Sequence, residues 1–415
     1  MKEINLNHIC KIEGHANLSL LIENKKVKKC ELKAVEGARF FEALVLNKKV
    51  EDIQEIVSRI CGICSVAHSV CCIQALEEAL GVKPTEIQKK IREILMIGER
   101  LRSNFTHLYF LSLPDYLDAS SALSLKEKHR DKIEDALKLI SLGNKIIETF
   151  GGREIHPFLK IEAGFEKKDF SFVIDEIKNI KPLIIKTIEL FLGLNYPVFE
   201  RECSYLSLKD KEYAIISGKV VSEDGKFIDD SYKKHLTENI KEYATSKFVL
   251  KDGKPYMLGA IARINNNFEQ LDEESRAYLK KVRFPFNNPF HNNIAQAIES
   301  LHLANRVIKL IENLEFNEEA FGFRIKEGDG VSAVEAPRGT LFHEYKIDRE
   351  GKIIYCNIIP PTTQNLNMME IDIKTLVNSL LSKNTPKEKI VREIEKLIRA
   401  YDPCFSCSTH FLKVK

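Results

Sequence analysis

Two Cys-x-x-Cys pairs near opposite ends of the chain constrain its fold more than any other feature. The first pair is Cys61 and Cys64, and the second is Cys404 and Cys407. The two-residue gap within each pair lets both sulfur atoms face one ion, and thiolates select soft metals such as zinc, nickel or iron. We therefore expect the fold to gather both pairs around one metal site.

A structural zinc site with four cysteine ligands is one interpretation of these pairs. Such sites usually join segments that are close in the sequence of a small domain, whereas these pairs lie 340 residues apart. A chain of 415 residues is also long enough to fold without a metal ion to stabilise it. His68 and His410 each follow one pair at a short interval, and Arg59 and Asp402 precede them. These additional polar residues favour a reactive site.

Composition and charge narrow the class of protein. Hydrophobic residues make up 44% of the chain and charged residues 30%, as in soluble globular proteins, and the net charge of +3 gives no reason to expect nucleic-acid binding. Apolar stretches such as residues 183–194 contain charges and are too short to span a bilayer. The N-terminus has no signal-peptide pattern. We expect a cytoplasmic protein, or a subunit exported alongside a signal-bearing partner.

The predicted β elements are small. Apolar and polar residues alternate over 16–22 and again over 30–34, which predicts a β-hairpin. A second hairpin is predicted over 341–359. Residues 205–285 are more polar and mixed, with a short strand candidate at 213–221.

Helical periodicity covers most of the remaining chain. It begins after Thr85, which with Gln88 fits a capping box. Further helices are predicted over 127–150, 172–194 and 289–314. Because no repeat or Gly/Pro-rich linker divides the chain, we expect residues 1–415 to form one compact domain of the mainly α, α+β class. Its helical-bundle core would carry the metal site, with an N-terminal β-hairpin and a second hairpin near the C-terminus.

Each cysteine pair adjoins a predicted helix. The first pair precedes an apolar pattern over 66–80 that ends at Gly81, so it lies at a helix N-terminus, where the dipole favours thiolate over thiol. The second pair follows a helix opened by Thr385 and Glu388 as a capping box, with Pro386 at the first helical position. The two helices can thus deliver their sulfur atoms to one place.

With these residues in view, the chain resembles the large, catalytic subunit of the [NiFe]-hydrogenases. Residues 59–68 (RICGICSVAH) and 402–410 (DPCFSCSTH) resemble the two signatures of that family. Further matches are 11–15 (KIEGH, with Lys in place of Arg), 39–42 (RFFE), 336–339 (APRG) and 361–365 (PTTQN). The resemblance extends from residue 11 to residue 410, and it is closer to cytoplasmic multisubunit enzymes than to membrane-bound ones.

The resemblance implies a nickel and iron centre. Nickel would be bound by Cys61, Cys64, Cys404 and Cys407, and the iron would carry cyanide and carbon monoxide as its remaining ligands. Cys64 and Cys407 would bridge the two metals, whereas Cys61 and Cys404 would bind nickel alone. His68 would donate a hydrogen bond to a bridging sulfur, as outer-shell residues often do at metal sites.

A second metal ion, magnesium or iron, is also implied. Its ligands would be Glu42, His410 and a backbone carbonyl near Ile358. Members of the family commonly lose the residues beyond the final histidine to a dedicated maturation protease after nickel insertion. Residues 411–415 fit such a cleavable extension.

Other matching residues would surround the metals. Arg338 would be poised over them with Asp402 as its ion partner, and Pro337 and Thr362 would line the diatomic ligands. The chain departs from the family at one place, because well-studied respiratory members have an acidic residue where this chain has Ser103.

Heterolytic cleavage of hydrogen requires a Lewis acid and a base within bonding distance. By analogy with the family, the Cys404 thiolate would accept the proton. Glu13 would relay it toward solvent, since a buried carboxylate with a raised pKa can exchange protons near neutral pH. Arg338 is a competing base, but its high ordinary pKa makes it a poor one.

The electrons need partner subunits, because the other cysteines form no cluster motif. We expect an iron-sulfur small subunit, together with further flavin- or iron-sulfur-containing electron-transfer subunits. The final acceptor, whether a deazaflavin, NAD(P), a heterodisulfide system, ferredoxin or sulfur, stays open. Two other classes also stay open: a nickel-free relative of the quinone-site subunit of respiratory complex I, which lacks the four cysteines, and a structural zinc protein.

Overall fold

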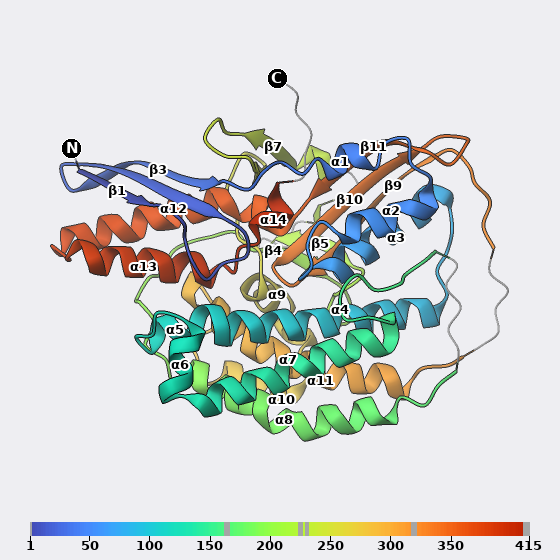
Figure 1. The fold of residues 1–415 in the computed structure, drawn as a ribbon, viewed down its shortest axis with the longest axis horizontal. Coiled ribbons are helices and arrows are strands. Elements are labelled where there is room, and N and C mark those ends of the chain that lie inside the picture. Colours follow the sequence, from blue (N-terminus) through green and yellow to red (C-terminus); the bar gives the residue numbers. More distant parts are fainter. Residues whose placement is uncertain (1, 162–166, 223–226, 229–231, 317–321, 410–415) are drawn as a thin grey trace.

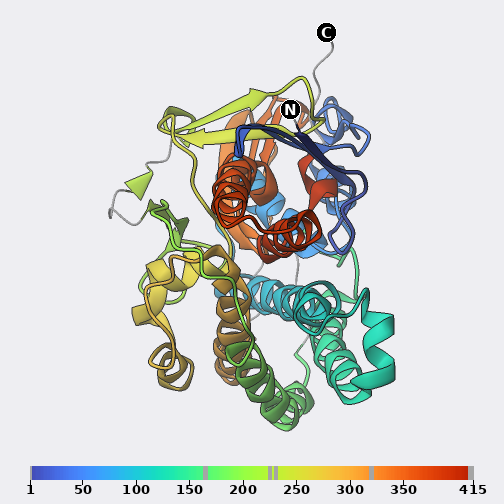
Figure 2. The same cartoon turned by 90° about the vertical axis from the view of Figure 1, so that its left-hand side faces the viewer.

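Helices and small sheets form two layers. The computed structural model describes residues 2–161, 167–222, 227–228, 232–316 and 322–409. Long helices lie in the lower half of Figure 1, and the sheets and C-terminal helices lie in the upper half; Figure 2 shows the same division from the end. This is the mainly helical α+β architecture that the sequence predicts.

The lower layer consists of long helices. They are α4 (Glu86–Thr106), α7 (Arg130–Gly151), α8 (Ser171–Leu192) and α11 (Asn292–Glu312), and the helices predicted at these places are confirmed. The predicted capping box is present, because Thr85 and Gln88 exchange hydrogen bonds between side chain and backbone before α4. Helices α4 and α7 approach closely at Gly143, where a Cβ atom would lie only 2.7 Å from the backbone nitrogen of Arg102.

The predicted N-terminal hairpin is confirmed. Strands β2 (Ala16–Glu23) and β3 (Lys26–Ala34) pair with Leu18 opposite Leu32, and the alternating apolar residues of β2 are buried. The sequence prediction missed β1 (Lys2–Leu6), which pairs with β2 along its other edge. The sheet contacts helix α12 (Pro361–Ser382) through β3 (Figure 1).

The second predicted hairpin is confirmed and has an additional strand. It consists of β10 (Gly339–Ile347) and β11 (Ile353–Ile359). The missed strand β9 (Gly328–Ala336) pairs with β10 on the other side and packs on α3 (Ser65–Leu80). Strand β9 is rich in small residues, which have weak strand preference in sequence. Arg338 lies in the tight turn from β9 to β10, and its side chain is buried.

The strand candidate at residues 213–221 is wrong over most of its length. Only Lys219–Ser222 forms a strand, β5. Tyr213 instead points inward, and its hydroxyl donates a 2.7 Å hydrogen bond to Glu299. The remaining strands here are β4 (Leu206–Lys209), β6 (Phe227–Ile228), β7 (Leu236–Ile240) and β8 (Lys247–Lys251).

The elements that carry the cysteines match their prediction except at one cap. Helix α3 ends before Gly81 as predicted. Helix α13 (Lys387–Ala400) has Pro386 as its N-cap residue with no side-chain cap, so the capping box of Thr385 and Glu388 is wrong. The N–H of Thr385 instead donates to the carbonyl of Leu380. Thr385 therefore caps the C-terminal end of α12 rather than the start of α13.

Short helices complete the chain. They are α1 (Phe41–Leu44), α2 (Val50–Ser58), α5 (Leu113–Tyr116), α6 (Ala122–Lys128), α9 (Ala260–Asn267), α10 (Glu273–Leu279) and α14 (Phe405–Ser408). A π-helical segment, His107–Ser112, joins α4 to α5. No helix within the described ranges combines the length and apolar character needed to cross a bilayer.

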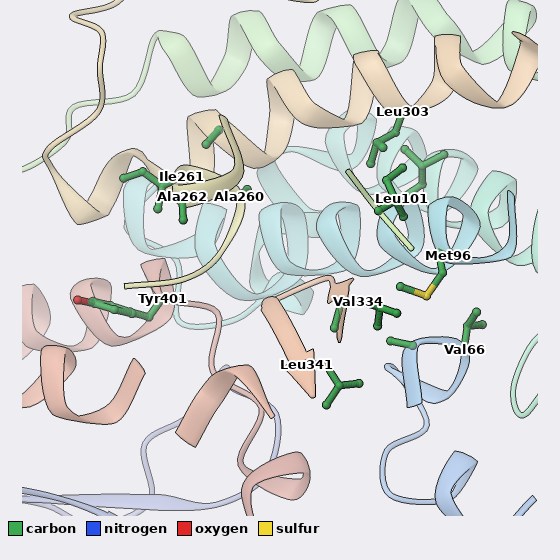
Figure 3. Packing of buried hydrophobic residues seen from close by; sticks show 14 of the residues in the cluster. Val66, Met96, Leu101, Ala260, Ile261, Ala262, Leu303, Val334, Leu341 and Tyr401 are labelled. Carbon is green, nitrogen blue, oxygen red and sulfur yellow. The ribbon is translucent and has the colours of Figure 1, made fainter. Parts of the chain in front are cut away.

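One hydrophobic cluster joins the two layers, with members from Ile4 to Phe405. Figure 3 shows side chains of α4 between the layers, with Leu101 toward Leu303 of α11 and Met96 toward Val66 and Val334. The four paired cysteines form a separate buried cluster. The core therefore supports the cysteine site from several sides.

Candidate metal centre

The structure brings the two cysteine pairs together in the interior. Cys61 lies in the loop between α2 and α3, Cys64 directly precedes α3, and Cys404 and Cys407 lie at α14. Their Sγ atoms all lie within 4.8 Å of one another, and none of the residues is more than 3% exposed. Even the 2.9 Å between the Sγ atoms of Cys404 and Cys407 is too long for a disulfide of about 2.05 Å. All four are free thiols.

The pKa values of these thiols indicate whether the cluster favours a bound cation. Hydrogen bonds from the three neighbouring thiols lower the pKa of Cys61 well below its ordinary value. Burial, in contrast, raises the pKa values of Cys404 and Cys407 well above theirs. Burial therefore opposes several thiolates in one dry site unless a cation compensates their charge, and four converging sulfur donors fit a soft transition metal.

Glu99 of α4 supports the start of the cysteine helix, and the sequence prediction missed it. Cys64 occupies the N-cap position of α3 but makes no side-chain cap hydrogen bond. The two carboxylate oxygens of Glu99 instead accept from the backbone N–H groups of Val66 at 2.6 Å and Ala67 at 3.1 Å. Burial raises the pKa of Glu99 to about 7. The helix thus begins without using the sulfur of Cys64.

Arg338 lies directly against the cysteines. Its Nη1 donates to the sulfur of Cys64 at 3.3 Å, its Nη2 to Oδ1 of Asp402 at 3.0 Å, and its Nε to the carbonyl of Asp402 at 2.8 Å. Burial opposes its charge, but Asp402 and the sulfur atoms raise the pKa of Arg338 well above its ordinary value. In the structure Arg338 is therefore a buried cation paired with Asp402 and in contact with Cys64.

Glu13 connects the cluster to the outer part of the protein. Its Oε2 accepts from the thiol of Cys404 at 2.9 Å and from the N–H of Ser406 at 3.1 Å. Its carbonyl accepts from the N–H of Phe405 at 3.0 Å. Gly14, with φ of 78°, permits this approach, because a Cβ there would lie 2.9 Å from the Cβ of Phe405. The expectation of a buried Glu13 is wrong, since the residue is half-buried and stands between Cys404 and the surface.

His68 lies in a chain of buried rings that the sequence prediction did not include. Its Nδ1 is 3.0 Å from Nε2 of His343, whose Nδ1 is 2.7 Å from the hydroxyl of Tyr345. Burial lowers the pKa of His68 to about 4, so the ring is neutral at physiological pH. No pattern in the sequence of β10 signals this contact with α3.

A small cavity of about 10 Å³ opens at the cysteines. It is lined by Cys64, His68, Ala336, Arg338, Leu341, Pro361, Thr362, Cys404 and Cys407. Thr362 also accepts a 2.8 Å hydrogen bond from the backbone N–H of Cys404. Among the described residues, Pro361 lines the cavity and Pro337 does not. The carbonyl of Pro337 instead accepts from Arg263 at 3.0 Å.

Glu42 lies at a second group of polar residues. Its Oε1 accepts from the backbone N–H of Ile358 at 3.0 Å and from Nζ of Lys247 at 2.9 Å. Lys247 also contacts Glu238 at 2.9 Å and Asn357 at 3.0 Å. The structure thus brings Glu42 and Ile358 together, but the N–H of Ile358 faces the carboxylate. His410 and residues 411–415 lie outside the described residues.

These oxygen atoms fit a hard cation in their chemistry. Burial raises the pKa of Glu42, which shows that its charge needs a cationic neighbour. Lys247 supplies that neighbour in the structure, and the sequence prediction missed it. No spacing along the chain relates a lysine in β8 to a glutamate in α1.

A buried ion network holds the turn that carries Arg338. Arg263 donates to both oxygens of Glu299, at 2.6 and 2.8 Å, and to the carbonyls of Ala336 and Pro337. Both charged residues are fully buried. Breaking such a pair typically costs about 3–5 kcal/mol. The turn between β9 and β10 is therefore held rigidly behind the cysteines.

Comparisons with known proteins agree with this geometry. The family model for nickel-dependent hydrogenases matches residues 39–148 and 216–410. The alpha subunit of sulfhydrogenase 1 from Pyrococcus furiosus is 35% identical over 99% of this chain and 98% of its own length. The alpha subunit of sulfhydrogenase 2 from the same organism is 33% identical over 99% of this chain and 100% of its own length.

A solved structure shares the fold. The structure of an NAD+-reducing [NiFe]-hydrogenase in the H2-reduced state superposes with a TM-score of 0.87 at 24% identity, and it covers 99% of this chain and 100% of its own. Family match, relatives and fold together confirm the resemblance drawn from the two cysteine signatures. The chain belongs to the nickel-dependent hydrogenase family and is a catalytic large subunit of the [NiFe] type.

Proposed function

We propose that this chain cleaves hydrogen reversibly and heterolytically at a nickel-iron centre bound by Cys61, Cys64, Cys404 and Cys407. The observation that carries the proposal is the convergence of four buried sulfur atoms within 4.8 Å. The protons would leave through Glu13, and the electrons would pass to an iron-sulfur partner subunit.

The residues that line the cavity support different ligand roles for the four cysteines. Cys64 and Cys407, the two proposed bridging ligands, both line it, together with Thr362. These residues would hold iron with its cyanide and carbon monoxide ligands. Of the four cysteines Cys61 alone does not line the cavity, which fits a terminal nickel ligand, whereas Cys404 lines it as well. Cys404 contacts Glu13, which fits a terminal ligand that also handles protons.

The bound metals would supply the Lewis acidity that polarises hydrogen. Cys404 would take up the proton at its sulfur, and Oε2 of Glu13, 2.9 Å away, would receive it next. Because Glu13 is half-buried, it can pass the proton outward. Arg338 would hold its charge throughout and keep Cys64 in place.

We also propose a magnesium or iron ion near Glu42. The carboxylates of Glu42 and Glu238 and the amide oxygen of Asn357 surround one cationic group, the ammonium of Lys247. His410 would complete the ligand set, with the carbonyl of Ile358 as a further donor. The hard oxygen donors support this proposal.

The metal content and mass of the purified enzyme test the proposed function. We expect the complex, purified without oxygen from a host that matures such enzymes, to contain nickel and iron and to reduce a dye with hydrogen. We further propose that a maturation protease removes residues 411–415. Intact mass of the same sample should then show a chain that ends at His410.

Two outcomes would contradict these proposals separately. A complex that contains zinc and lacks nickel would support a structural metal site and would exclude hydrogen cleavage here. An active, nickel-loaded chain that still carries residues 411–415 would exclude only the cleavage.

We place the iron-sulfur partner over the loop of the first cysteine pair. Gly62 is exposed between the buried Cys61 and Cys64, so the centre lies just beneath this surface. Ile155, which is 46% exposed, approaches Gly62 within van der Waals distance, and Phe158 nearby is 65% exposed. We propose that these two apolar side chains belong to the interface, as contiguous exposed apolar patches often do. A partner bound to this face would lie close to the metal centre, which shortens the path for electron transfer.

A charge at Phe158 should weaken assembly. We expect Phe158→Asp to lower recovery of the iron-sulfur partner on a tagged catalytic chain by tenfold or more, since it buries a charge at the interface. Leu123→Asp is the matched control, because Leu123 is 82% exposed on α6, which precedes the N-terminus of α7, whereas Phe158 follows its C-terminus. Equal recovery with both variants would remove this face from the interface.

The names of the relatives support a complex of several subunits. They are named as alpha subunits of sulfhydrogenases. We infer a cytoplasmic complex with the iron-sulfur small subunit, together with further flavin- or iron-sulfur-containing subunits. The electron acceptor would be chosen by those partners.

A further inference from the structure

We propose that Gln296 and His107 are positioning residues that hold Asp402 and, through it, Arg338 over the cysteines. Neither residue contacts a cysteine, and the proposed function assigns them no role. The inference rests on that function in one respect, because the consequence of misplacing Arg338 is read at the metal centre.

Asp402 is shared between two partners. Its Oδ1 accepts from Arg338 Nη2 at 3.0 Å, and its Oδ2 accepts from Gln296 Nε2 at 3.1 Å. All three side chains are nearly fully buried, with at most 4% exposure. A carboxylate bound at one oxygen only could rotate about its side-chain bonds, whereas a second donor holds its plane. Gln296 therefore supports the side-chain part of the Arg338–Asp402 contact, beside the bond from Arg338 Nε to the Asp402 carbonyl.

His107 sets the orientation of the Gln296 amide. Its Nδ1 lies 2.6 Å from Oε1 of Gln296, and its Nε2 lies 2.6 Å from the carbonyl oxygen of Arg399. Since the amide oxygen of Gln296 can only accept, Nδ1 of His107 is its donor, while the contact at Nε2 ties the ring to α13. The Nδ1–H group binds the oxygen side of the amide and turns the NH2 group toward Asp402.

The backbone around His107 is unusual as well. His107 opens the π-helical segment His107–Ser112, and such segments interrupt α-helices frequently at functional sites. One turn earlier on the same helix, the buried hydroxyl of Ser103 has no hydrogen-bond partner among the described residues. His107, at the C-terminal end of α4, thus connects this helix to the Arg338–Asp402 pair. Ser103 donates no hydrogen bond to that pair.

The chain of contacts ends at the sulfur atoms. Arg338 Nη1 donates to Cys64 at 3.3 Å, so a shift of the guanidinium changes a charged hydrogen bond to a proposed bridging ligand. The electron density on that sulfur would change with it. The metal ligands themselves would keep their positions, because Gln296 supports none of them directly.

Gln296→Leu tests the proposal in the purified complex. We expect unchanged nickel and iron contents, roughly ten- to hundredfold lower hydrogen turnover, and shifted infrared bands of the carbon monoxide and cyanide ligands. Ser103→Ala, a neighbour of His107 whose hydroxyl is unpartnered, should leave turnover and infrared bands unchanged.

Gln296→Glu gives a readout that a packing defect would not produce. A glutamate there can donate to Asp402 only when protonated, so its turnover relative to the wild type should rise as pH falls. Should Gln296→Leu fail to bind metals, the pH profile of Gln296→Glu decides. Wild-type bands in metal-loaded Gln296→Leu, or a wild-type pH profile for Gln296→Glu, would overturn the positioning role. A wild-type complex without nickel would instead overturn the proposed function.

Discussion

Replacing Cys64 by alanine is expected to abolish hydrogen turnover and the binding of nickel and iron. Cys64 is one of four sulfur donors, lines the cavity, and is the one that accepts from Arg338. Its loss would remove a ligand that we propose both metals share, and a site with one bridge cannot hold them as a pair. Elemental analysis and hydrogen-dependent dye reduction measure the effect.

The same variant should keep its fold. Cys64 makes no cap hydrogen bond for α3, because Glu99 binds the first N–H groups of that helix. Removing one small buried side chain should cost only about 1–2 kcal/mol of unfolding free energy. Circular dichroism and thermal unfolding should therefore differ little from those of the metal-free wild type.

Cys71→Ala is the matched control on the same helix. Cys71 is fully buried like Cys64, but its thiol lies near the carbonyls of Ser332 and Leu341, away from the cluster. We expect this variant to bind both metals and remain active. Nickel and iron at wild-type levels in Cys64→Ala would show that the four-cysteine ligand set is wrong.

Sequence patterns predicted the parts of this fold that local chemistry determines. The hairpin over residues 16–34 follows from alternation, and α4 follows from the capping box at Thr85 together with its apolar periodicity. The convergence of the cysteines was predictable for a different reason. Two thiol pairs with metal-ligand spacing often bind one ion together, so the chemistry of the ligands predicted a long-range contact that no local pattern indicates.

The remaining parts depend on tertiary packing and left no local signal. Gln296 is 106 residues from Asp402, and nothing in the pattern of α11 distinguishes it from the other polar residues of that helix. Lys247 reaches Glu42 across 205 residues. Tyr213 lies in an apolar run that favours a strand by pattern, but its hydroxyl is drawn inward to Glu299. Such contacts form only in the folded protein, so the sequence of one helix or strand does not predict them.

Glu13→Gln is expected to slow proton exchange and turnover by roughly 10²- to 10⁴-fold while leaving both metals in place. The glutamine oxygen can still accept from the N–H of Ser406, so the loop before Cys404 should keep its conformation. What is lost is the ability of the side chain to take a proton from the sulfur of Cys404, 2.9 Å away. Exchange between deuterium gas and water measures this step, because it needs proton transfer but no electron acceptor.

Glu36→Gln separates this role from a general effect of charge. Glu36 is a nearby carboxylate that pairs with His15 at 2.5 Å and contacts no cysteine, so its neutral variant should exchange at the wild-type rate. If Glu13→Gln exchanged as fast as Glu36→Gln, the proton would have to leave Cys404 by another route. Arg338, the competing base that contacts Cys64, would then be the first candidate for that route. A slow Glu13→Gln beside a normal Glu36→Gln would therefore assign the exit from Cys404 to one carboxylate.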